Sequence, residues 1–73
     1  MNSFFNFRFT VNLYDNNDED YVIQTENLRN KKAAIQTALR LNKQNPNCYC
    51  KIYNELKPNQ NPIIIGTPDK FKN

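Results

Sequence analysis

The chain has 73 residues, of which 38% are hydrophobic, and its formal net charge is +3. A domain of about 60 residues buries only about 60% of the surface of its unfolded chain, so there is room for one domain with a small core. The sequence contains no histidine, one glycine and one serine, Ser3. These counts exclude an imidazole base, a Ser-His or Cys-His pair and a glycine-rich phosphate loop. We therefore expect a non-catalytic protein that uses no cofactor.

The charges are divided unevenly along the chain. Up to position 27, five acids and one base give a segment charge of −4, and from position 28 onward nine bases and two acids give +7. Such a division favours a polar partner for the basic segment. A dipolar surface that keeps a protein in solution has the same composition and is the alternative.

The hydropathy pattern and the two cysteines indicate a compartment. No segment has the roughly 18–20 consecutive apolar residues that a membrane span needs, and the first nine residues lack the apolar core of a signal peptide. We therefore expect a cytoplasmic protein in which Cys48 and Cys50 stay reduced. Two cysteines are too few for a structural zinc site, so we predict no metal site and treat both as small buried residues.

Two strands are predicted in the first third of the chain. Residues 4–14 alternate between apolar and polar side chains, which is typical of a half-buried strand. Residues 15–20, with the sequence DNNDED, are typical of a polar turn. The β-branched and aromatic residues of 21–25 predict a second strand. The two strands should form an antiparallel hairpin.

A helix is predicted from Leu28 to about Gln44. Thr25 or Asn27 can cap its start, and Pro46 ends it, because the residue before a proline is disfavoured in helical geometry. At about 100° per residue, six apolar residues share one side of this helix: Leu28, Ala34, Ile35, Ala38, Leu39 and Leu41.

Two further strands complete the predicted fold. Residues 48–56 are typical of a strand, 57–61 of a turn, and 62–65 of a short strand whose initial proline suits a sheet edge. Residues 1–66 thus form a single α+β domain with the order ββαββ, in which one helix packs on one face of a four-stranded, mainly antiparallel sheet. Residues 67–73 are expected to be a flexible tail.

The predicted core combines the apolar face of the first strand with inward-facing residues of the other elements. Its members are Phe5, Phe7, Phe9, Val11, Leu13, Ile23, Ile35, Leu39, Cys50, Ile52 and one of Ile63, Ile64 and Ile65. Five apolar residues on one strand exceed what a single short helix can cover. We therefore also predict a homodimer.

The predicted helix carries the pattern that is most informative about function, a basic face without acids. Five residues fall within about 80° of arc on this face: Arg29, Lys32, Gln36, Arg40 and Lys43. Lys31 adds a charge near the first turn. Exposed helices usually mix the signs of their charges, so the face is typical of contact with phosphates or with an acidic protein surface. A solvated face that pairs with the acidic turn is the third interpretation.

The other face of the sheet offers a second candidate surface. It interleaves aromatic and basic side chains, namely Arg8, Tyr49, Lys51 and Tyr53, with Thr10 and Tyr14 beside them. Stacking platforms for single-stranded nucleic acid have this composition, although no RNP-type motif is present. Tyrosine is also common in protein interfaces, which leaves that interpretation open.

The sequence therefore predicts a small binding module. We expect it to bind nucleic acid through the basic helix face. The alternative is a protein–protein interaction protein, such as a phage-type accessory or anti-defence inhibitor that docks on an acidic surface of a host protein. The two partners differ in a measurable property, because binding to phosphates weakens steeply with salt and a packed protein interface loses much less.

Overall fold

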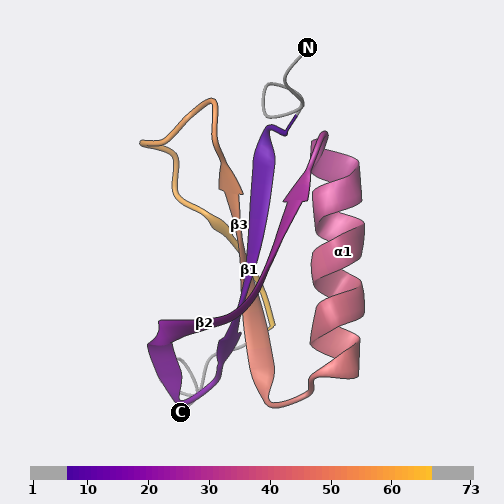
Figure 1. Ribbon diagram of the computed structural model, residues 1–73, viewed down its shortest axis with the longest axis vertical. Helices are drawn as coiled ribbons and strands as arrows, with labels where there is room; N and C mark the ends of the chain where they lie inside the picture. Colours follow the sequence, from indigo (N-terminus) through magenta and orange to yellow (C-terminus); the bar gives the residue numbers. More distant parts are fainter. Residues whose placement is uncertain (1–6, 67–73) are drawn as a thin grey trace.

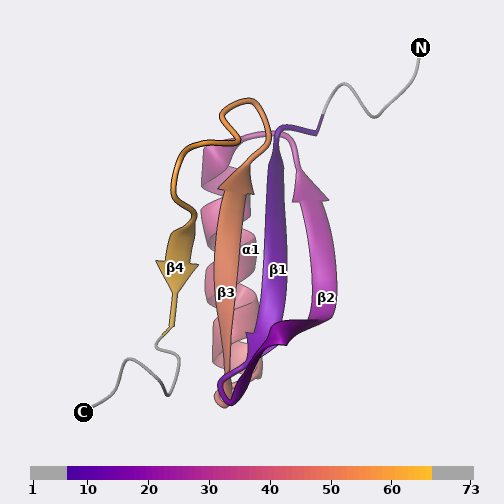
Figure 2. The same cartoon turned by 90° about the vertical axis from the view of Figure 1, so that its left-hand side faces the viewer.

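The computed structural model describes residues 7–66, which form one sheet and one helix. The elements in chain order are β1 (Phe9–Asp15), β2 (Asp18–Leu28), α1 (Lys31–Gln44), β3 (Cys48–Asn54) and β4 (Ile63–Ile65). The strand order is β2-β1-β3-β4, and every neighbouring pair is antiparallel. Figure 2 shows α1 on one face of this sheet, behind β1 and β3. The predicted α+β fold is confirmed.

The core forms where α1 covers the middle of the sheet. Val11 and Leu13 on β1 are 0% and 1% exposed, and they lie opposite Ile52 and Cys50 on β3. The whole buried cluster consists of Val11, Leu13, Ala34, Ala38, Leu41, Cys50 and Ile52. The period of two in the first strand therefore predicted the correct buried face of β1.

Three residues of the predicted core are exposed instead. Ile23 is 45% exposed because β2 is irregular there: Gln24 lies opposite Leu13 and Val22 opposite Tyr14, which leaves Ile23 without a partner on β1. Phe7, which precedes β1, is 38% exposed.

The third is Leu39, at 52% exposure, because α1 turns its alanine side toward the sheet. Ala34, Ala38 and Leu41 form the buried line of the helix, whereas Ile35 is only half-buried against the core. Phe5, another predicted core residue, lies outside the described residues. The predicted tail, residues 67–73, also lies outside them. The homodimer was predicted from the apolar residues on one face of the first strand. Within residues 7–66, α1 covers Val11 and Leu13 of that face and leaves Phe7 exposed, so the homodimer stays a prediction.

The strand β2 is longer than predicted, and it takes residues from both the predicted turn and the predicted helix. It begins at Asp18, opposite Asp15, so that only two residues form the turn of the hairpin. Its first part bends toward the side of the sheet opposite to α1 (Figure 1). Its last residue, Leu28, pairs with Phe9 and packs against the core, and is therefore not helical.

The helix consequently begins three residues later than predicted, at Lys31. Asn30 is the cap, with extended backbone (φ −139°), and its Oδ1 accepts a hydrogen bond from the backbone N–H of Ala33 at 2.8 Å. The predicted caps Thr25 and Asn27 lie within β2. At the other end α1 stops at Gln44, as Pro46 predicted.

The turn after β4 depends on a glycine. Gly66 has φ +94°, a conformation that side chains with a Cβ rarely adopt. A Cβ at this position would lie 2.5 Å from Nδ2 of Asn42, and this amide is already held by a hydrogen bond to the carbonyl of Cys48 at 2.9 Å. Both the backbone and the packing therefore require glycine here.

We predict that Gly66→Ala lowers the free energy of unfolding by about 1–3 kcal/mol, through backbone strain and displacement of Asn42. Urea unfolding followed by circular dichroism measures this loss. Addition of Asn42→Ala to the variant should remove the collision but not the backbone strain, so the two substitutions should be less than additive. A Gly66→Ala protein as stable as the wild type would show that this turn does not adopt the described geometry.

Candidate nucleic-acid interface

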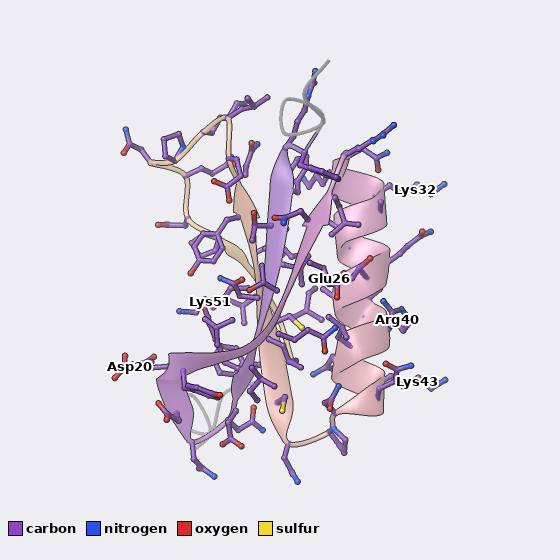
Figure 3. The ribbon with its side chains drawn as sticks, in the orientation of Figure 1. Asp20, Glu26, Lys32, Arg40, Lys43 and Lys51 are labelled. Carbon is purple, nitrogen blue, oxygen red and sulfur yellow. The ribbon has the colours of Figure 1, made fainter. Side chains whose placement is uncertain are left out.

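The outer side of α1 presents the basic residues that the sequence singled out. Four of the five predicted residues lie on the exposed side of the helix: Lys32, Gln36, Arg40 and Lys43. Figure 3 shows the three charged ones pointing away from the sheet. At 1.5 Å per residue they extend over roughly 16 Å along the helix axis. We call these four residues, together with the exposed Leu39 that borders them, the basic helix face.

The cations of the basic helix face have no acidic partner within residues 7–66. Arg40 donates to the side chain of Gln44 at 3.5 Å, which is a neutral acceptor. The nearest strand edge carries Glu26, and its carboxylate accepts a hydrogen bond from Gln24 at 2.8 Å instead. The acidic hairpin bend lies on the other side of the molecule, as the position of Asp20 in Figure 3 shows. The interpretation that the basic helix face pairs with the acidic turn of the same molecule is therefore wrong.

Arg29 does not belong to the helix, contrary to the prediction. It lies in the two-residue link between β2 and α1 and is exposed. Lys31, by contrast, is the first helical residue, and the first turn contains no acid to offset its charge or the positive end of the helix dipole. The basic surface thus continues from the outer side of α1 to its N-terminal end.

Leu39 is the feature of this face that the sequence pattern missed. On the helical wheel it lies about 20° from Lys32, on the side away from Arg40. It is 52% exposed, although the periodicity assigned it to the core. The face therefore has an exposed apolar side chain at the edge of its row of cations, where sequence reasoning had expected charge alone.

The second candidate surface differs more strongly from its prediction. Tyr49 is 1% exposed and Tyr14 is 5% exposed, so neither ring is open to a stacking base. Their ring centroids are 5.2 Å apart at 68°, an edge-on contact. The Nζ of Lys51 lies 5.2 Å from the centroid of the Tyr14 ring, a cation–π contact that places this charge over the cluster. Tyr14, Tyr49 and Lys51 therefore form a small packed cluster and not an open stacking platform.

The hydroxyl groups of Tyr49 and Tyr53 have raised pKa values and stay protonated at neutral pH. Burial raises the pKa of Tyr53 to about 12, with a contribution from its hydrogen bond to Tyr14. Burial also raises the pKa of Tyr49, and the negative charge of Glu19 raises it further. Arg8 does not join the cluster; its backbone N–H bonds to the carbonyl of Leu28 at 3.0 Å and extends the β1–β2 ladder.

The two cysteines lie on the helix side of the sheet as free thiols. Cys50 is fully buried, and its Sγ donates a weak hydrogen bond to the carbonyl of Ala38 at 3.7 Å. Burial raises the pKa of Cys50 to about 11, and it also raises the pKa of the half-buried Cys48. Within residues 7–66 no three metal-binding side chains cluster together.

Comparisons with protein-family models, with curated proteins and with solved structures yield no match to this chain. In the part of the chain that the structure describes, no helix is long and apolar enough to cross a membrane. A function must therefore be inferred from the residues of the basic helix face and their surroundings.

The buried thiol predicts a pH dependence of stability. An unfolded thiol ionises near pH 8.5–9, whereas Cys50 ionises near 11 in the folded chain, so folding favours the protonated form. The stability that folding gains from the protonated Cys50 thiol is complete below about pH 8.5 and is lost as the pH rises through 11.

Cys50→Ala should lower the free energy of unfolding by about 1 kcal/mol at pH 7, because it leaves a small cavity. Its loss of stability between pH 9 and 11 should also be smaller than that of the wild type.

Chemical unfolding at several pH values measures both effects, and Tyr53 contributes equally to the two proteins at high pH. Cys48→Ala serves as the control, since Cys48 is more exposed and its substitution should change the curve less. Parallel curves for the wild type and Cys50→Ala would contradict the buried, protonated state of this thiol.

Proposed function

We propose that this protein binds nucleic acid through the basic helix face. The observation that supports this function most directly is the set of three exposed cations, Lys32, Arg40 and Lys43, none of which has an acidic partner within residues 7–66. Unpaired cations of one sign repel one another along a helix, so the isolated protein gains nothing from the arrangement. A partner with closely spaced negative charges removes this repulsion.

A phosphate backbone supplies such charges at regular spacing. Binding of a cation to a phosphate releases condensed counterions, which favours association and makes it depend on salt. Gln36 lies within the same arc and adds a side chain that can both donate and accept hydrogen bonds. The N-terminal turn, with Lys31 and without an acid, adds positive charge at that end of the helix, although Lys31 lies about 100° from Lys32 around the helix axis.

A second candidate function is binding to an acidic protein surface, and Leu39 favours it. Phosphates do not require an apolar contact, whereas protein interfaces commonly place an apolar residue at the centre of a charged rim. At 52% exposure, Leu39 has enough free surface to enter an apolar pocket of a partner. The two candidates therefore assign different roles to one residue.

The first test removes the charges of the basic helix face. The variant Lys32→Gln, Arg40→Gln, Lys43→Gln keeps helix propensity nearly unchanged, so its melting temperature should stay close to that of the wild type. Affinity for a fluorescein-labelled oligonucleotide, measured by fluorescence anisotropy, should fall about tenfold or more. The slope of log K against log salt should become less negative by about 2–3, because about three phosphate contacts are lost.

A control variant removes two charges elsewhere, through Arg8→Gln and Lys51→Gln. It should retain most of the wild-type affinity. An equal loss of binding free energy per charge removed in the two variants would mean that net charge, and not the helix face, determines binding, and would count against the proposal.

The second test separates the two candidates by Leu39→Gln. Nucleic-acid affinity should change less than about threefold, since phosphate contacts carry most of the binding free energy. A large loss of oligonucleotide binding in this variant would contradict a backbone-dominated interface. If the wild type binds no oligonucleotide and instead binds a purified acidic protein in a manner that Leu39→Gln abolishes, the second candidate replaces the first.

A further inference from the structure

A cavity of about 350 Å³ opens beside the N-terminal end of α1. Its walls come from four places in the chain: the start of β1, the first residue of α1, the end of β3 with β4, and the loop between these two strands. The volume lies at the small end of the range for cavities that bind small molecules or parts of larger ones.

The walls combine apolar and polar chemistry in a specific way. Phe9, Ile52 and Ile63 supply an aromatic ring and two aliphatic side chains. Three side-chain amides line the same space, those of Asn54, Gln60 and Asn61. Each amide offers donors and an acceptor, which is the combination that reads the edge of a nucleobase.

Two lysines give the cavity a positive charge. Lys31 and Lys57 line it from different elements, and no acidic residue is among the residues that line it. Neither lysine has an ion-pair partner within residues 7–66. An apolar ring with hydrogen-bonding edges and an attached negative charge therefore matches the cavity better than a purely apolar or a cationic ligand.

The loop that bears Lys57 is held in place by its own hydrogen bonds. The carbonyl of Asn54 accepts from the backbone N–H of Lys57 at 3.0 Å, and the carbonyl of Lys57 accepts from the N–H of Gln60 at 3.0 Å. The side chain of Asn54 also accepts from the N–H of Leu56 at 3.0 Å. The wall of the cavity is thus ordered before any ligand arrives, which lowers the entropic cost of binding.

We propose that this cavity binds one nucleotide, with the base against Phe9 and Ile63 and the phosphate on Lys31 and Lys57. This assignment rests on the proposed function, because the basic helix face begins at Lys32, next to Lys31, and can hold the rest of a strand. A base inside a duplex cannot enter such a cavity without being unpaired. The protein should therefore prefer single-stranded nucleic acid to a duplex of the same sequence.

The test uses two neighbouring substitutions on β4. Ile63 lines the cavity and lies opposite Ile52, whereas Ile64 lies opposite Lys51 on the other face of the sheet. The two side chains are similarly exposed, at 37% and 40%. Ile63→Trp should fill the cavity, and Ile64→Trp adds the same ring outside it. Circular dichroism and thermal unfolding check that both variants are folded.

The readout is the fluorescence anisotropy of a labelled single-stranded oligonucleotide and of the corresponding blunt duplex. Ile63→Trp should weaken single-strand binding about tenfold, the contribution of one stacked base, and leave duplex binding unchanged. Ile64→Trp should leave both unchanged. Equal binding of the two forms by the wild type, together with no effect of Ile63→Trp, would overturn the nucleotide site while the proposed function stands.

A mononucleotide titration distinguishes failure of the proposed function from failure of the nucleotide site. It also shows whether the cavity takes a free nucleotide or only one that belongs to a strand. It follows the side-chain amide signals of Asn54, Gln60 and Asn61 in a ¹⁵N-labelled protein, with inorganic phosphate as the comparison. If no oligonucleotide binds, the proposed function fails, and shifts of these signals by a mononucleotide but not by phosphate would support a site for free nucleotides. If neither oligonucleotides nor mononucleotides shift them, the cavity is not a nucleotide site.

Discussion

Ala34 and Ala38 let α1 lie close against the sheet, and the orientation of every other helical residue follows from this contact. Both alanines are 0% exposed, and the carbonyl of Ala38 comes within 3.7 Å of the Cys50 thiol on β3. Small side chains allow such an approach between elements, whereas leucine at the same place would hold them apart. With this line buried, the opposite side of the helix must carry its charges into solvent. The basic helix face is therefore a direct result of core packing.

The strongest local patterns in the sequence predicted the fold correctly. The predictions failed where one segment fits two patterns. Alternation identified the buried side chains of Val11 and Leu13, and Pro46 located the end of α1. Leu28 fits the apolar side of a helix and also the last position of a strand. Only its pairing with Phe9 decides between the two, and this pairing depends on residues that are far apart in the sequence. The position of the helix cap and the exclusion of Arg29 from α1 follow from that decision.

The candidate sites show the same difference between local and long-range information. Periodicity alone placed Lys32, Gln36, Arg40 and Lys43 on one side of a helix, and these four are exposed together. The burial of Tyr14 and Tyr49 could not be read from alternation, which places them on a solvent face but says nothing about side chains that pack over one another. The cavity could not be predicted from the sequence either, because its lining residues come from separate elements that no spacing rule connects.

The acidic bend of β2 and the basic helix face lie on opposite sides of the molecule (Figure 3). A particle with charges separated in this way experiences a torque near a polyanion, which turns its positive side forward before contact. If a polyanion binds as proposed, the acidic side points away from it and repels a second polyanion. For the proposed interaction, rotation during approach would thus replace part of the random search for a productive orientation. This advantage shrinks as salt shortens the range of the field, to about 8 Å at physiological ionic strength.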